Sequence, residues 1–303
     1  EAQTMGGKTK KKRDWKAINE KYVKEGELWL DEKTLKNWVK KVLKKNKNKV
    51  GAPYFYPDDF MQFCGIISSL FQLHLRQLEG FLHTIRKLKV FPSVPNYVTL
   101  SRRIPVLPWE ELPYTAWDKP IVIAQDSSGI KVSPYSEWIR HKWNVRRGFI
   151  KLHVSVNIEN HEVVGVKITN EKKSDASQFS SLLNQTLKKG KVCKDLADGA
   201  YDKNKCFELL EKKGIEPAIK LRKNASSKRG CPLRRKEVRL RKQLGSQEAW
   251  RDEKEYGQRW QGESFYSSFK RRFGESVISR SFYAMKREIL RKLWVYNWLV
   301  QLS

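Results

Sequence analysis

The sequence has few cysteines, histidines and acidic residues, and it has no long hydrophobic run. It contains four cysteines and five histidines. No two cysteines form a Cys-x-x-Cys pair, and none stands at zinc-finger spacing from a histidine, which disfavours both a zinc ribbon and a disulfide-linked scaffold. Free cysteines fit a reducing, intracellular setting. No segment approaches the roughly 18 apolar residues of a membrane span, so we expect no contact with a bilayer.

The shortage of acids makes the chain strongly basic. Its 303 residues include 62 Lys and Arg against 33 Asp and Glu, which gives a formal net charge of +29. Such an excess predicts a polyanionic partner. The chain is nevertheless 39% hydrophobic and 12% aromatic, enough to bury a core. At about 150 residues per domain, its length predicts two domains.

The first 50 residues form a basic amino-terminal arm. Residues 1–50 hold 16 Lys and Arg against 7 Asp and Glu. A lysine-rich stretch is by default a solvated face of the protein. The alternative is a flexible arm that contacts a phosphate backbone.

Residues 51–118 show the periodicity of three short helices. The first is expected after a cap at Asp58 or Asp59, the second from Arg76, and the third after a cap at Asn96. Their spacing of three and four residues defines one buried face on each helix. The inward-facing residues are Phe60, Phe63, Ile67, Leu70, Leu78, Leu82, Ile85, Leu100 and Ile104.

The third helix carries basic residues on its predicted outer face. Arg102 and Arg103 are expected to point outward with Thr99, as in a helix-turn-helix DNA-binding unit, although any three-helix bundle gives the same periodicity. Four prolines follow within residues 105–120, a composition typical of an extended boundary. We therefore expect residues 51–118 to be a helical DNA-binding region.

Residues 119–303 change to the pattern of an α/β domain. Residues 121–125 are a continuous apolar run that ends at Asp126, as in a strand buried on both faces. Residues 150–157 alternate between apolar and polar side chains, and residues 163–168 are expected to pair back onto them as an antiparallel hairpin.

Helices and strands alternate after this hairpin. A helix is followed by a strand over residues 192–197, which leads to Asp198, and a helix capped by Asp202 precedes a strand over residues 218–221. This order predicts an α/β fold, a mixed sheet with helices on both faces, and it matches an RNase H-like core.

Two aspartates follow predicted strands at what should be the same edge of the sheet. Asp126 and Asp198 could each be an ordinary turn or cap residue. Functional sites of open α/β sheets are built at such strand ends, however, and carboxylates are the ligands that Mg²⁺ prefers. Two of them at one edge of a strongly basic chain favour a metal site.

A third carboxylate stands in a helical pattern further along the chain. Tyr256, Arg259, Glu263 and Lys270 would share one face of a helix through this region. Such a helix could aim Glu263 at the site. The alternative is an exposed face whose Arg and Glu form a weak i,i+4 pair. The opposite face would hold Phe265, Phe269 and Phe273.

The order of these acids resembles the DDE triad of bacterial and archaeal insertion-sequence transposases. Asp126 comes first, Asp198 stands in Ala-Asp-Gly-Ala-Tyr-Asp, and Glu263 lies in a Tyr-(2)-Arg-(3)-Glu-(6)-Lys signature without a spacing error. The similarity extends over roughly residues 50–303 and implies that residues 119–303 are an RNase H-like catalytic domain.

The resemblance implies a metal-dependent DNA transposase. The three acids would be catalytic residues and ligands of two Mg²⁺ or Mn²⁺ ions, and the enzyme would cleave DNA at terminal inverted repeats and transfer the freed strand. The partners would be double-stranded DNA, both transposon ends and target, with a homodimer in the active complex in a prokaryotic cytoplasm, close to the nucleoid. The implied DNA contacts are Tyr256, Arg259, Lys270 and, stacked on a flipped base, Tyr201.

Other features permit both structural and functional interpretations. Residues 222–242 carry 10 Lys and Arg against one acid, so a basic insertion near residues 222–255 is expected to track DNA unless it is a solvated loop. Trp138 and Trp143 could stack on bases or pack on the sheet. His153 is expected to be a satisfied sheet histidine. The last segment, Phe282 to Leu299, is expected in the core or at a dimer surface.

Two alternatives to a transposase remain open from the sequence. One is a two-metal nuclease or integrase that does not mobilise an element. The other is a non-catalytic DNA-binding regulator derived from a transposase.

Overall fold

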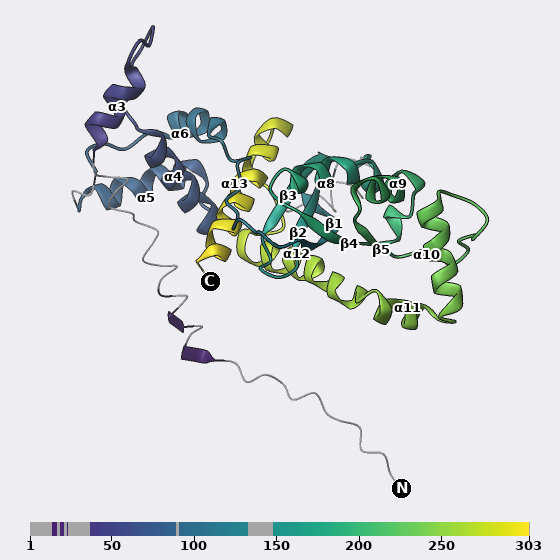
Figure 1. Ribbon diagram of the computed structural model, residues 1–303. Helices are drawn as coiled ribbons and strands as arrows, with labels where there is room; N and C mark the ends of the chain where they lie inside the picture. Colours follow the sequence, from purple (N-terminus) through teal and green to yellow (C-terminus); the bar gives the residue numbers. More distant parts are fainter. Residues whose placement is uncertain are drawn as a thin grey trace.

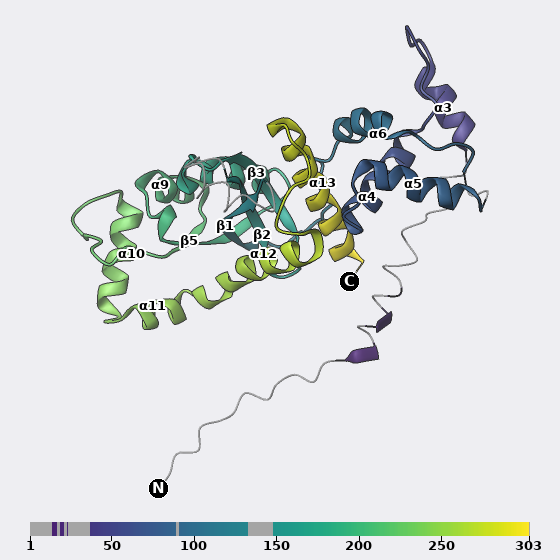
Figure 2. The same ribbon diagram turned by 180° about the vertical axis from the view of Figure 1, so that it is seen from behind.

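The computed structural model describes residues 37–88, 91–132 and 148–302, and a few isolated positions between 14 and 23. A helical region lies at one end, a sheet covered by helices lies in the middle, and α10 and α11 lie at the other end (Figure 1), as the view from behind also shows (Figure 2). Most of the predicted basic arm falls outside the described residues. Within the described parts of the chain, no helix combines the length and the apolar character needed to cross a bilayer.

The amino-terminal region is helical, as predicted. Its elements are α3 (Trp38–Asn46), α4 (Asp58–Leu70), α5 (Leu75–Arg86), α6 (Tyr97–Arg103) and the 3-10 helix η1 (Ile104–Val106). Phe60, Leu78 and Leu100 are fully buried at its centre. Asn96 caps α6, because its side-chain oxygen accepts a hydrogen bond from the amide of Thr99 at 2.8 Å.

Two details of this region differ from the sequence-based expectation. The N-cap of α4 is Pro57, so Asp58 and Asp59 belong to the first turn, where their charges still favour the helix N-terminus. Arg103 points inward, since it lies one turn after the buried Leu100 and so shares its face. The predicted outward direction is therefore wrong for Arg103.

The inward guanidinium of Arg103 is held by three groups. It donates to Asp58 Oδ1 at 2.8 Å and to the carbonyl of Tyr56 at 3.2 Å, and it lies 4.5 Å from the ring centroid of Tyr54. Arg102, by contrast, is exposed. Only Arg102 of the predicted pair is therefore presented to a partner.

The central sheet has five strands in the order β3-β2-β1-β4-β5. The strands are β1 (Ile121–Lys131), β2 (Phe149–Asn157), β3 (Val163–Asn170), β4 (Val192–Ala197) and β5 (Glu216–Ile219). β2 is antiparallel to both β1 and β3, whereas β4 is parallel to β1 and β5 is parallel to β4. This mixed sheet confirms the predicted RNase H-like α/β arrangement.

Helices cover both faces of the sheet (Figure 1). One face packs on α8 (Phe179–Leu187) and α9 (Asn204–Lys213), where Ile123, Phe179 and Phe207 share a buried cluster. On the other face, α12 (Trp260–Phe273) and α13 (Phe282–Gln301) cover β2 and β3, and the residues predicted on the apolar side of α12 are buried there. These residues are Phe265, Phe269 and Phe273.

Strand β1 is longer than its apolar run predicted. It continues to Lys131, so Asp126 lies within the strand and not at its end. The reason is tertiary: β2 pairs with β1 as far as Lys131, while the pairing of β4 with β1 stops at Gln125. An apolar run marks only the part of a strand that is buried on both faces.

The predicted cap at Asp202 is also wrong. The N-cap of α9 is Lys203, and Asp202 is instead bound by Arg234 from α10 (Pro232–Gln243) at 2.6 Å. The Asp202 carboxylate also accepts a hydrogen bond from the amide of Arg222 at 3.1 Å. An ion pair between distant segments thus replaces a local cap.

The last helix, α13, joins the helical region to the sheet. Trp294 packs edge-on against Trp109 with ring centroids 5.7 Å apart, and Arg291 donates to Ser69 at 2.9 Å. On its other side, the buried Asn297 receives the amide of Val163 in β3 at 2.9 Å. The final segment is therefore part of the core, one of its two predicted positions.

We expect Asn297→Ala to destabilise the fold. The Asn297 side chain also donates to the carbonyls of Val163 and Pro113, both at 2.8 Å. Its loss leaves a buried amide and two carbonyls without these partners, which should lower the free energy of unfolding by about 2–4 kcal/mol. Thermal unfolding should show a fall of several degrees, whereas the exposed Gln301→Ala on the same helix should change little. Equal melting temperatures for the two variants would contradict this role.

Candidate active site

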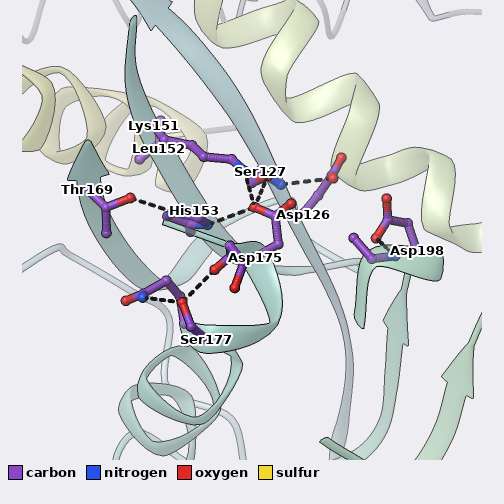
Figure 3. A network of polar contacts seen from close by, with 12 residues as sticks. Asp126, Ser127, Lys151, Leu152, His153, Thr169, Asp175, Ser177 and Asp198 are labelled. Atoms are coloured by element: carbon purple, nitrogen blue, oxygen red, sulfur yellow. Dashed lines mark hydrogen bonds and ion pairs between the residues drawn. The ribbon is translucent and has the colours of Figure 1, made fainter. Parts of the chain in front are cut away.

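The register of β1 and β4 places the two aspartates side by side. Gln125 and Ala197 form the last pair between these strands, and the next residues are Asp126 and Asp198. Asp198 turns the chain into the 3-10 helix η3 (Gly199–Tyr201), and its carboxylate accepts the amide of Ala200 at 2.9 Å. Figure 3 shows both carboxylates at this end of the two strands.

The third acid comes from the start of α12. Glu263 lies in its first turn, after the 3-10 helix η4 (Tyr256–Arg259), so the predicted single helix is in fact two elements. The preceding residue, Gly262, packs on β1: a β-carbon at that position would lie 3.7 Å from the β-carbon of Asp126. This close approach brings Glu263 beside the two strand residues.

Arg259 lies between two of the three acids. Its guanidinium is 3.8 Å from Asp126 Oδ2 and forms an ion pair with Glu263. The Glu263 side chain is 59% exposed, whereas that of Asp126 is 17% exposed. The positive charge of Arg259 therefore partly neutralises one acid that is mostly buried and one that is mostly exposed to water.

The pKa of Asp126 shows that the acids act on one another. This pKa is raised from 3.8 to about 6: burial is the largest cause, the charges of Asp198 and Glu263 add to it, and the Ser127 amide and Arg259 oppose it. Three carboxylates thus share a small region in which at least one resists ionisation. Such perturbed acids are common at functional sites.

Comparison with known protein families identifies the family of this chain. Residues 117–298 match a family model described as a transposase DDE domain, and residues 23–134 match a second model with the same description. The chain belongs to the DDE transposase family. A solved structure, the cryo-EM intasome of simian T-cell lymphotropic virus in complex with the PP2A regulatory subunit B56 gamma, matches at 16% identity and a TM-score of 0.25. That match covers 52% of this chain and 51% of the other.

The acids of this DDE transposase chain have the right chemistry for divalent cations, which prefer carboxylate oxygens. In the conformation described, however, no three His, Cys, Asp or Glu side chains among the described residues lie close enough together to hold an ion. The guanidinium of Arg259 lies beside Asp126 and Glu263, where a bound metal cation would neutralise their charges. The donor set therefore fits Mg²⁺ or Mn²⁺, provided that Arg259 moves.

Two other residues of the signature make contacts within the fold. Tyr256 is 6% exposed, and its hydroxyl donates to the carbonyl of Ala197 at 3.2 Å, which ties η4 to the end of β4. Lys270 donates to the hydroxyl of Ser128 at 2.8 Å. The structure thus places both residues against the strands that carry the two aspartates.

Tyr201 is not available for stacking on a base. Its ring is 1% exposed and packs against Phe179 with centroids 5.7 Å apart. The position three residues after Asp198 put it next to the site in sequence, but η3 turns it into the core. We therefore do not retain it as a DNA contact in this conformation.

Tyr266 is a site residue that the sequence did not single out. Its hydroxyl lies 3.0 Å from the carbonyl of Asp126 and 2.9 Å from that of Leu152, so it fixes α12 to β1 and β2. In the sequence, Tyr266 stands three residues after Glu263, one turn along the same helix, and begins a stretch to Gly274 that resembles the same transposase group.

The predicted basic insertion is a folded helical unit. Residues 222–255 form α10 and α11 (Gln247–Glu253), and the nearly buried Lys254 binds Glu237 at 3.0 Å and Glu216 at 3.1 Å, which ties both helices to β5. Arg241 donates to the carbonyl of Arg222 at 3.0 Å. Within residues 222–242 the exposed basic residues are Arg222, Lys223, Lys228, Arg229, Lys236, Arg239 and Lys242. Trp138 and Trp143 lie outside the described residues.

We expect Asp126→Asn to stabilise the protein in metal-free buffer above pH 6. Because folding raises the pKa of Asp126 from 3.8 to about 6, the folded state favours the protonated carboxyl, and ionisation costs stability as the pH rises through this window. The gain should be near zero at pH 4 and about 1–3 kcal/mol at pH 8. Unfolding in EDTA across this range measures it.

The matched control is Asp118→Asn, which neutralises an exposed aspartate just before β1. Its effect on the free energy of unfolding should be small at every pH. An Asp126→Asn protein that is no more stable than wild type at pH 8 would contradict the electrostatic description of the site.

Proposed function

We propose that this protein is a DNA transposase that binds the terminal inverted repeats of an insertion sequence and catalyses metal-dependent cleavage and strand transfer. The observation that carries the proposal is the convergence of Asp126, Asp198 and Glu263 from two adjacent strands and one helix. Membership of the DDE transposase family supports it.

The three acids would hold two Mg²⁺ or Mn²⁺ ions. When bound, such ions activate the attacking oxygen and stabilise the leaving oxygen of an in-line phosphodiester displacement. The residues of this chain set the conditions for them: the amide of Ser127 orients the Asp126 carboxylate, and the amide of Ala200 orients that of Asp198. Arg259 would leave the acids and pair with a DNA phosphate, which a guanidinium can bind through two parallel hydrogen bonds.

The DNA contacts would come from cations around this site. Arg259 and Lys270 are the nearest, and Tyr256 would act through the position of η4, because its hydroxyl is already bonded to the main chain. The exposed basic residues of segment 222–242 would track the backbone of the transposon end, and Arg102 would contact DNA from α6. Two transposon ends in one complex imply a homodimer, and the setting would be the prokaryotic cytoplasm near the nucleoid.

We expect neutralisation of any one acid to abolish cleavage without abolishing DNA binding. Asp126→Asn, Asp198→Asn and Glu263→Gln should each lower the rate of end cleavage by ~10³-fold or more, because each removes a metal ligand. Affinity for the end, measured in Ca²⁺ or EDTA, should stay within about threefold, since the loss of a negative charge does not weaken phosphate contacts. Chelation should stop wild-type cleavage, and Mg²⁺ or Mn²⁺ should restore it.

The control for this experiment is Asp118→Asn, which should cleave like wild type. Undiminished cleavage by one of the three variants would remove that residue from the site. Joining of a precut end to target DNA separates a transposase from a nuclease that only cuts. Binding without cleavage in either metal would instead indicate a DNA-binding regulator.

We expect charge reversal on α10 to weaken DNA binding in a salt-dependent manner. Arg239 and Lys242 are exposed and three residues apart on this helix. The double change to Glu should weaken binding to all sequences and make the slope of log affinity against log salt less negative by about 1–2, because up to two phosphate contacts are lost. Fluorescence anisotropy at several salt concentrations measures the slope.

The matched control changes the same number of charges elsewhere. Lys212 and Lys213 are exposed at the end of α9, on the face of the sheet opposite α12. Their double change to Glu should leave the slope closer to that of wild type. Identical slopes for the two double variants would show that α10 is not part of the DNA track.

A further inference from the structure

A fourth acid, Asp175, lies beside the site and takes no part in the triad. It begins the 3-10 helix η2 (Asp175–Ser177), between β3 and α8. A single oxygen of its carboxylate, Oδ1, faces three polar groups of β1 and β2 (Figure 3). The hydroxyl of Ser127 and the ammonium of Lys151 are each 2.6 Å away, and Nδ1 of His153 is 3.3 Å away.

The pKa of Asp175 is shifted in the opposite direction to that of Asp126. Burial alone would raise its pKa, but the donors His153, Lys151 and Ser127 outweigh this effect and hold the pKa well below its usual range. The carboxylate is therefore an anion at any working pH, and the oxygen that faces the strands is already occupied. These properties suit an anchor better than a metal ligand.

His153 links Asp175 to the neighbouring strand β3. Its ring is fully buried, and its Nε2 lies 2.9 Å from the hydroxyl of Thr169 on β3. The prediction of a satisfied sheet histidine is thus confirmed only for Nε2, because the buried Nδ1 faces Asp175 at 3.3 Å without forming a hydrogen bond. The contacts of Asp175 and His153 connect η2 with β1, β2 and β3.

Ser127 connects this anchor to the first catalytic residue. It directly follows Asp126, and its amide donates to Asp126 Oδ1 at 2.8 Å. The pairing of β1 with β4 ends one residue before Asp126, so at this point the ladder to β4 no longer fixes the strand. The hydroxyl of Ser127 on Asp175 supplies a side-chain restraint where that ladder has ended.

We propose that Asp175 is a positioning residue, which holds Ser127 and, through the Ser127 amide, fixes the orientation of the Asp126 carboxylate. The inference rests on the proposed function for its effect on the reaction, and on the contacts alone for its effect on β1. Supporting contacts behind a metal-ligating carboxylate commonly change metal affinity or activity by about 10–100-fold when removed.

The test compares Asp175→Asn, Ser127→Ala and the double variant in end cleavage under saturating Mg²⁺. Each single variant should lower the rate constant of cleavage by about 10-fold or more and leave the KM for DNA unchanged, since neither residue is proposed to touch DNA. The double variant should be no slower than the slower single variant, because Ser127→Ala removes the same connection that the loss of charge in Asp175→Asn weakens. Ser127→Ala leaves the contacts of Asp175 with Lys151 and His153 in place, so it also covers the case in which Asp175→Asn folds poorly.

Glu171→Gln is the matched control, since it neutralises another acid in the same connection between β3 and η2. It should leave cleavage unchanged. Strictly additive losses in the double variant would overturn the proposal. So would an Asp175→Asn protein that melts at a lower temperature but cleaves normally per folded molecule.

A second readout separates this proposal from the proposed function. Amide hydrogen exchange over residues 121–131 should become faster in Asp175→Asn and in Ser127→Ala, while β4 should exchange as in wild type. This outcome would support the anchor even if the wild-type protein cleaved no DNA. Exchange in β1 that stays unchanged, or that rises equally in every strand, would overturn it.

Discussion

The site depends on one step in the sheet, where β4 stops pairing with β1 but β2 does not. The last β1–β4 pair is Gln125 with Ala197, whereas β2 follows β1 to Lys131. This step brings Asp126 and Asp198 next to each other, and it leaves the amide of Ser127 to bind a carboxylate instead of a strand. The start of α12 packs on β1 at the same place through Gly262, and Glu263 follows it in the chain. A longer β4 would place ladder hydrogen bonds where the three acids now gather.

The same step creates an electrostatic cost that other groups offset. Burial, together with the like charges of Asp198 and Glu263, raises the pKa of Asp126 to about 6, so an ionised Asp126 destabilises the fold that holds it. Arg259 partly compensates by pairing with Asp126 and Glu263. In the proposed function a divalent cation would replace this guanidinium, and Arg259 would exchange two carboxylates for a phosphate. The metal ion would then neutralise the acids, and the DNA phosphate would neutralise Arg259. Each ligand would favour the binding of the other, because each pairs with a group that the other separates from its partner.

The sequence predicted features that depend on local chemistry and missed those that depend on partners. The bounds of β4 and the cap at Asn96 were predicted correctly, because a buried apolar run and an Asn before a helix act locally. Asp202 was predicted as a cap, yet Arg234, 32 residues away, takes its carboxylate. Tyr201 and Asp175 show the same limit at the site: the spacing that placed Tyr201 near Asp198 could not show that η3 buries it, and no motif indicated that Asp175 meets two strands. The assignment of Asp126, Asp198 and Glu263 came from the resemblance to the DDE pattern, and their catalytic role stays a prediction.

The tertiary structure separates the basic residues behind the net charge of +29 into those paired with acids inside the fold and those exposed on its surface. Arg103, Arg234 and Lys254 are bound to acids within the fold, so they contribute rigidity and not a binding surface. Lys254 is the clearest case, because its ion pairs tie α10 and α11 to β5 and so fix the direction in which the exposed Arg239 points. A row of cations on a rigid helix loses less conformational freedom on binding a phosphate backbone than the same cations on a loop. The internal ion pairs of this basic protein therefore give the exposed cations of α10 a fixed geometry.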